Sequence, residues 1–258
     1  MSVTILNLGA AAFRLGPIYG LPDDHPQAQE VSTIPLLCFC LHTEDCIVLV
    51  DAPACPEDVP EEFKLPNYTP PPPLLEQLAK LEVKPEDVRE VVITHTHWDH
   101  YNGLTREENG CFLPLFPQAR HILNRADWHP DSFGPLEKQT LQVIADNQLF
   151  TFIDSWMEPA SDVVIIHTPG ETPGHQIVEW RSENKQIHYF CGDLYHHPIE
   201  FDDPSLNVRW AEPKKMRESK EMLLKMASQN GGLVYFSHIE GVYRIRKEGE
   251  RFVFERKA

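Results

Sequence analysis

The stretch THTHWDHYNG, residues 94–103, places three histidines and one aspartate within six positions. It overlaps the end of residues 88–94, a β-branched and apolar run that predicts a buried strand. Alternate side chains of an extended segment point the same way, so part of this set can converge on one metal ion while the rest reaches a second. Imidazole and carboxylate groups suit zinc, and also iron, manganese or cobalt. The four candidate ligands are His95, His97, Asp99 and His100.

Three further candidate ligands favour a metal centre over a surface patch of pH-sensitive histidines, which the stretch alone would also allow. His175 follows a Thr-Pro-Gly turn, and Asp193 and His238 each follow an apolar run that predicts a strand. Chemistry in α/β proteins is usually placed just beyond strand ends. The repeated placement therefore predicts a site assembled from distant parts of the chain.

The charge of the chain excludes several classes of partner. The formal net charge is −16 over 258 residues, which repels nucleic acid and favours a small neutral or zwitterionic substrate. No apolar run is long enough to span a membrane, and the first twelve residues lack the pattern of a secretory signal. The six cysteines form no CxxC pair, which is typical of reduced thiols in a cytoplasmic protein. The sequence leaves open whether the chain forms a homodimer.

Strands and helices are expected to alternate along the whole chain. Helical spacing of apolar residues predicts helices over residues 74–81, 136–148 and 216–228. Two segments are too rich in proline, glycine or aspartate for regular structure: residues 16–29, and residues 53–73, which we expect to wall the site. Strands are expected over residues 3–8, 34–41, 46–51, 88–94, 121–123, 163–167, 176–181, 186–192, 233–236, 243–246 and 251–254.

The order His-x-His-x-Asp-His, then Thr-Pro-Gly-His, Gly-Asp and a late histidine resembles the metallo-β-lactamase superfamily. The resemblance covers nearly the whole chain, from the first strand to His238, and the motifs are highly specific as a set. It implies a single domain over residues 1–258, with an αββα sandwich of two mixed sheets flanked by helices. The metals would lie at one edge of the two sheets.

The resemblance also implies the ligands of two divalent metal ions, with zinc expected first. One ion would be held by His95, His97 and His175, the other by Asp99, His100 and His238, and Asp193 would bridge them. A hydroxide bridging the two ions would be the nucleophile of a hydrolase. Asp99 would serve as a ligand and also orient the nucleophile or pass a proton to the leaving group; a purely structural role is the alternative.

Two segments are similar to the branch that holds quorum-quenching lactonases and organophosphate-type hydrolases. Residues 167–176 are similar to the doubled Pro-Gly-His turn of that branch, except that Glu171 stands at the first histidine position, which is not a usual metal ligand. Acyl-homoserine-lactone lactonases often carry a tyrosine three positions after the bridging aspartate. Here that position is His196, with Tyr195 one residue early. His196 is the candidate hydrogen-bond donor to the substrate, unless it is a loop histidine without a role.

The resulting hypothesis is the hydrolysis of a small ester, above all a lactone, at a dinuclear centre. A thioesterase or phosphotriesterase with the same site is an alternative, and a persulfide dioxygenase with one iron is another, although Trp98 stands where those enzymes usually have alanine. A structural metal site would be closed by four ligands per ion, which seven ligands for two ions do not provide. Candidate pocket residues are Phe13, Ile18, Tyr19, Phe63, Tyr68, Trp98, Trp128 and Phe133.

Overall fold

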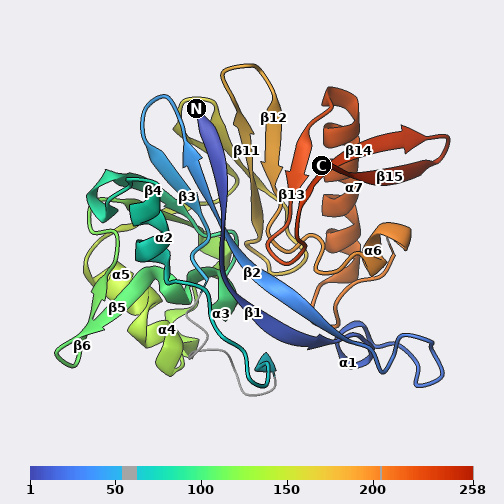
Figure 1. Ribbon diagram of the computed structural model, residues 1–258, viewed down its shortest axis with the longest axis horizontal. Helices are drawn as coiled ribbons and strands as arrows, with labels where there is room; N and C mark the ends of the chain where they lie inside the picture. The colour runs from blue at the N-terminus through green and yellow to red at the C-terminus, as the bar shows by residue number, and fades with distance from the viewer. Residues whose placement is uncertain (54–62, 204, 258) are drawn as a thin grey trace.

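The computed structural model describes residues 1–53, 63–203 and 205–257 and arranges most of their strands in two sheets (Figure 1). The first sheet has six described strands, antiparallel over its first three and parallel from the third to the last. In spatial order they are β1 (Ser2–Arg14), β2 (Val31–His42), β3 (Ile47–Val50), β4 (Val88–Val92), β7 (Arg120–Asn124) and β8 (Phe150–Ile153).

The second sheet has seven described strands, and each neighbouring pair is antiparallel except β12 and β13, which run parallel. In spatial order they are β15 (Arg251–Lys257), β14 (Val242–Glu248), β13 (Leu233–Tyr235), β12 (Ile187–Phe190), β11 (Gln176–Arg181), β10 (Val163–His167) and β9 (Trp156–Ala160). A separate hairpin joins β5 (Thr105–Glu108) to β6 (Cys111–Pro114).

The longest described helix, α7 (Pro213–Asn230), has clear boundary signals in the sequence. Glu212 accepts hydrogen bonds from the first free backbone N–H groups, Pro213 fits the first turn, and Gly231 takes the left-handed conformation that ends the helix. The other α-helices are α1 (Leu15–Tyr19), α2 (Leu74–Lys80), α3 (Trp98–Tyr101), α4 (Pro135–Gln139), α5 (Leu141–Asp146) and α6 (Ile199–Asp202), and single 3-10 turns cover Pro85–Asp87, Asn102–Leu104, Arg125–Asp127 and Pro130–Ser132.

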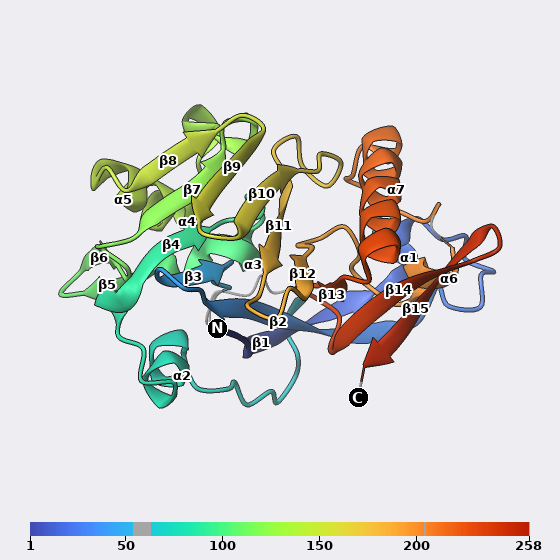
Figure 2. The ribbon, with the colours of Figure 1, turned by 90° about the horizontal axis from the view of Figure 1, so that it is seen from above.

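Three buried clusters show how the layers pack, and Figure 2 shows α2 and α7 on opposite sides of the two sheets. Between the sheets, side chains such as Phe39 of β2 meet Phe190 of β12. Outside the first sheet, α2 and α5 pack through residues such as Leu78, and outside the second sheet α7 packs through residues such as Leu223. Strands buried on both faces explain the continuous apolar runs in the sequence. The expected αββα sandwich is present.

Several expected elements differ in detail from the structure. Residues 16–29 are not loop throughout, because α1 occupies their start and ends at Gly20 in the left-handed conformation. The helix expected over residues 136–148 is two helices, broken where the Thr140 hydroxyl bonds the Leu136 carbonyl and the backbone leaves helical angles. The first strand extends to Arg14, and β8, β9 and the β5–β6 hairpin had no expected counterpart. Of residues 53–73, residues 54–62 lie outside the described chain, and residues 63–73 contain no α-helix or strand.

The predicted ligands follow strands that belong to different sheets. His95 comes shortly after β4 of the first sheet, whereas Asp193 and His238 follow β12 and β13 of the second. The loop that holds Glu171 and His175 joins β10 to β11. Two sheets therefore bring their loops to one edge of the sandwich. None of the helices in the described part of the chain is long and apolar enough to cross a membrane.

Candidate metal centre and pocket

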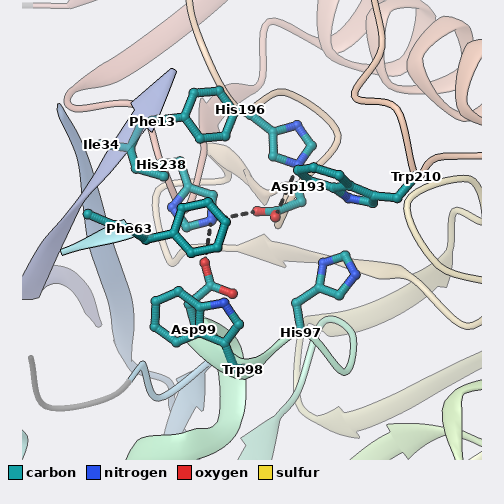
Figure 3. Close-up of a pocket in the computed structure, with 11 residues that line it drawn as sticks. Phe13, Ile34, Phe63, His97, Trp98, Asp99, Asp193, His196, Trp210 and His238 are labelled. Atoms are coloured by element: carbon teal, nitrogen blue, oxygen red, sulfur yellow. Dashed lines mark ion pairs between the residues drawn. The ribbon is translucent and has the colours of Figure 1, made fainter. Parts of the chain in front are cut away.

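Asp99, His100 and His238 form one group of donors, and Asp193 lies against two of them; Figure 3 shows His238 paired with both Asp99 and Asp193. The Oδ1 atom of Asp193 is 3.3 Å from His100 Nε2 and 3.2 Å from His238 Nε2. His238 Nε2 is also 3.2 Å from Asp99 Oδ2. The donor atoms of Asp99, His100 and His238 lie within 4.8 Å of one another, so these three residues can hold one ion with Asp193 at its side.

A second group of four donors lies on the other side of Asp193. His95 Nε2 is 2.9 Å from His97 Nδ1 and 3.6 Å from Asp193 Oδ2, and His97 Nδ1 is 3.2 Å from Glu171 Oε1. The donor atoms of all four residues lie within 4.8 Å of one another. Glu171 therefore belongs to this group, although the sequence did not mark it as a ligand.

His175 lies close to the group that contains His95 but is oriented differently. Its ring lies 5.2 Å from the ring of His95, centroid to centroid, and its Nε2 atom accepts a hydrogen bond of 3.1 Å from the Asp193 backbone N–H. Its Nδ1 atom faces Thr168, at 2.8 Å from Oγ1 and 3.1 Å from the carbonyl oxygen. Burial lowers the pKa of His175 to about 4, which keeps the ring neutral, as a metal ligand must be.

Most histidines of the centre direct one ring nitrogen away from it, toward a fixed polar partner. Such partners set the tautomer and ring orientation of a ligating histidine. Asp51 is the carboxyl example: it is fully buried directly after β3, and no local sequence pattern marks its role. The contacts are His95 Nδ1 to Thr94 Oγ1 at 3.2 Å, His100 Nδ1 to Asp51 Oδ2 at 2.8 Å and His238 Nδ1 to the Pro35 carbonyl oxygen at 2.9 Å.

Asp127 joins two of the loops that build the centre. Its Oδ1 atom accepts a 2.6 Å hydrogen bond from the Gly174 N–H, and its Oδ2 atom accepts from the Thr172 hydroxyl and the Thr96 N–H. A Cβ atom at residue 174 would stand 2.6 Å from Asp127 Oδ1, so the Pro-Gly turn needs glycine there. Asp127 thus fixes the Glu171–His175 loop against the loop of His95 and His97.

The electrostatics of the centre favour bound cations. Burial alone would lower the pKa of His238, but the carboxylates of Asp193 and Asp99 raise it to about 9. Among the described residues, the buried atoms His100 Nε2, Asp193 Oδ1 and Glu171 Oε2 have no hydrogen-bond partner. Buried polar atoms are usually paired, and donor atoms that face one another unpaired fit divalent metal ions. The residues present therefore fit the two ions that the sequence resemblance implies.

His196, and not Tyr195, faces the pocket above the donors. His196 Nε2 is 3.2 Å from both Glu171 Oε1 and Asp193 Oδ2, and its ring stacks on Phe13 with 6.5 Å between centroids. Tyr195 turns into the core, where its ring packs against Phe236. The sequence left open which of the two residues meets the substrate, and only His196 lies where it can.

A cavity of about 210 Å³ opens above the donors, and its surface is mostly apolar. Figure 3 shows Phe63 and Trp98 on one side and Trp210 on the other, with Asp193 between them. Trp210 donates from its indole nitrogen to Glu171 Oε1, which connects the wall of the pocket to the metal donors. The lining residues are Ala11, Phe13, Ile34, Phe63, His97, Trp98, Asp99, Asp193, His196, Trp210 and His238.

The prediction of the pocket-lining residues was correct only in part. Phe13, Phe63 and Trp98 line the cavity, whereas Ile18 and Tyr19 are buried in the core and Tyr68 lies outside the lining. Trp128 and Phe133, which we also expected near the substrate, instead pack against each other, and Trp128 also packs against Phe150 and Phe152 of β8. Ile34 and Trp210 were missed, because nothing in their local sequence distinguishes them from other apolar residues.

Residues 37–238 match the model of the metallo-beta-lactamase superfamily, a span that contains every predicted ligand. The chain belongs to this superfamily. The match confirms the predicted family, and the two-sheet architecture confirms its fold. The chain is a member of a superfamily whose related proteins are metal-dependent hydrolases, as the sequence predicted.

Sequence relatives of this superfamily member include two lactonases. It is 28% identical over 158 residues to an N-acyl homoserine lactonase of a Bacillus species, of which the match spans 58%. It is 24% identical over 218 residues to an N-acyl homoserine lactonase of Bacillus cereus, and that match covers 80% of this chain and 81% of the relative.

Two solved structures share its fold at low sequence identity. The dizinc quorum-quenching lactonase AidC, determined with its product N-hexanoyl-L-homoserine, has a TM-score of 0.76 and 17% identity, covering 99% of this chain and 94% of that one. The hydrolase AbOPH has a TM-score of 0.78 and 18% identity over the same shares of the two chains.

Proposed function

We propose that the protein is a dinuclear metal-dependent lactonase that opens the ring of a small lactone. The observation that carries the proposal is the pair of donor groups that share Asp193 beneath an apolar cavity. The N-acyl homoserine lactonases among its relatives support this substrate class. A lactone offers the compact polar ring and apolar tail that such a pocket can accept.

Two divalent ions, with zinc as the first candidate, would be held by the residues of the two donor groups. We assign His95, His97 and His175 to one ion, Asp99, His100 and His238 to the other, and Asp193 to both. When bound, such ions acidify a water molecule and polarise the ester carbonyl.

The chain itself positions the substrate and handles its protons. His196 stands between the donors and the apolar wall, so its Nε2 can donate to the lactone carbonyl oxygen as negative charge develops there. The Asp99 carboxylate lines the same cavity and is in reach to pass a proton to the leaving alkoxide. Ile34 and Phe63 would hold an acyl chain, and His196 would hold the polar end.

A substrate panel tests this proposal against its alternatives. The metal-free protein is reloaded with Zn²⁺, Mn²⁺ or Co²⁺ and offered N-acyl homoserine lactones of increasing chain length, simple γ-lactones, thioesters, phosphotriesters and a persulfide. We expect lactones to give the highest kcat/KM and a chelator to abolish the activity. Oxygen consumption with a persulfide, or a thioester or phosphotriester preferred over every lactone, would contradict the proposal.

A further inference from the structure

Glu171 is a buried carboxylate at a position where the doubled Pro-Gly-His turn has a histidine. The residue is 3% exposed, and its carboxylate faces the donor atoms of His97 and His196. A buried charge is costly unless it is paired or binds a metal. What it faces therefore matters.

The contacts of Glu171 leave part of the carboxylate without a partner. Oε1 accepts from the Trp210 indole nitrogen and lies 3.2 Å from both His97 Nδ1 and His196 Nε2. Oε2 is buried and, in the described chain, has no hydrogen-bond partner. No lysine or arginine forms an ion pair with Glu171 among the ion pairs of the described residues, whose only partners for this carboxylate are histidines.

The distances around His97 suit three ligands of one ion. Metal–nitrogen and metal–oxygen bonds of about 2.1 Å place neighbouring ligand atoms about 3 Å apart. His97 Nδ1 stands 2.9 Å from His95 Nε2 and 3.2 Å from Glu171 Oε1. The group of mutually close donors that contains these atoms includes Glu171 and Asp193, whereas His175 Nε2 is occupied by the Asp193 N–H.

We propose that Glu171, rather than His175, is a ligand of the first metal ion, the one beside His95, His97 and Asp193. It thereby replaces the assignment of His175 to that ion. This inference rests on the metal centre of the proposed function. With Glu171 as a ligand, three carboxylates would bind the two ions: those of Asp99, Asp193 and Glu171. A donor set richer in charged oxygen favours manganese or iron more than an imidazole set does, so residue 171 would set the metal preference of the first position.

The competing explanation is that Glu171 only orients its neighbours. In that case the carboxylate would hold Trp210 and His196 by hydrogen bonds and never touch a metal ion. Glutamine can still accept the Trp210 hydrogen bond but is a much poorer metal ligand. The substitution Glu171→Gln therefore separates the two roles, and Glu171→His restores the imidazole that the doubled turn has there.

The experiment measures metal binding without any substrate. Metal-free wild type, Glu171→Gln and Glu171→His are titrated with Zn²⁺, Mn²⁺ and Co²⁺ against a chromophoric chelator, and the visible spectrum of the Co²⁺ forms is recorded. We expect Glu171→Gln to lower the affinity for one of the two ions by more than roughly 100-fold, because changing an outer partner of a ligand costs only about 10–100-fold. The Co²⁺ spectrum should change, and Glu171→His should bind Zn²⁺ well but Mn²⁺ poorly.

Two controls make the result decisive. Glu90→Gln makes the same chemical change at a buried glutamate that pairs with Arg120, far along the first sheet from the donors, and should bind both ions as wild type does. Trp210→Phe removes only the indole donor to Glu171 and should weaken metal binding about 10-fold, less than Glu171→Gln does. If Glu171→Gln fails to fold, as circular dichroism would show, the loss of Mn²⁺ relative to Zn²⁺ binding in Glu171→His carries the test.

Wild-type affinity and an unchanged Co²⁺ spectrum in Glu171→Gln would overturn the inference, and so would an equal loss in Trp210→Phe. A protein that binds two ions in a Glu171-dependent way but hydrolyses no lactone would instead refute the proposed function alone. Lactone hydrolysis with Glu171-independent metal binding would refute only the role of Glu171.

Discussion

The metal donors and the apolar wall of the pocket face the same cavity but are built in different ways. The donors stand within a few residues of strand ends, and most of their rings are held by a second hydrogen bond, as Asp51 holds His100. The wall combines side chains of the β1–β2 pair, Phe13 and Ile34, with Phe63 and Trp210 from segments between elements. Rigid strands thus position the chemistry, while segments free to vary position the substrate.

The largest effect is expected where the two donor groups meet. Asp193→Asn removes the negative charge shared by both groups, and the neutral amide is a weak ligand. We expect at least one ion to be lost and lactone hydrolysis to fall by more than roughly 1000-fold, since even outer partners of metal ligands are worth about 10–100-fold. Elemental analysis and initial rates measure both effects. An active variant that keeps two ions would show that Asp193 does not join the groups.

His196 lies at the boundary between the donors and the wall. Its loss should therefore reduce catalysis without reducing the amount of bound metal. His196→Ala removes the proposed donor to the carbonyl oxygen and should lower kcat about 100-fold, as expected for one oxyanion donor. The metal content should stay at the wild-type value. His196→Tyr restores a donor and should recover part of the rate. A normal kcat in His196→Ala would mean that the histidine only fills space.

Asp51 tests whether the donors depend on their outer partners. Asp51→Asn keeps the shape but removes the charge 2.8 Å from His100 Nδ1, and we expect metal affinity to fall about 10–100-fold. A chelator competition measures the change. Asp154→Asn, at a carboxylate that is 79% exposed and ion-paired to Arg125, is the matched control and should bind metal as wild type does. Equal behaviour of the two variants would remove Asp51 from the account.

The smallest effect is expected at the wall. Ile34→Ala enlarges the cavity without touching a donor, so KM for long-chain acyl lactones should rise about tenfold, while kcat should change less than about twofold. Short-chain lactones should show little change. Val31→Ala, at an exposed position of the same strand, should alter neither constant. A fall in kcat for every chain length would show that the wall also positions the reacting atoms.

The sequence predicted the fold and the donors because both depend on local patterns. Apolar runs such as Ile47–Val50 predict buried strands, and histidines directly after such runs mark the edge where loops meet. Seven predicted ligands lie at that edge, although His175 turns its Nε2 toward a backbone N–H. Their roles as ligands stay predictions until metal is measured.

The remaining features depend on tertiary contacts that no local pattern reveals. Asp51 meets His100 from 49 positions away, and Asp127 holds Gly174 across 47 positions. Glu171 was set aside because its position is not a usual ligand, yet its carboxylate lies 3.2 Å from a histidine donor. Two weaker signals were available: a glutamate where the doubled turn has histidine, and a tryptophan, Trp210, just before the helix start at Pro213.

The central claim is a two-metal centre joined by Asp193 beneath the pocket. Anomalous X-ray diffraction at the zinc edge, from crystals of protein reloaded with Zn²⁺, tests it most directly. The result expected is two peaks per chain, one beside His95 and His97 and the other beside His100 and His238, with Asp193 between them. A single peak, or two peaks without Asp193 between them, would contradict it.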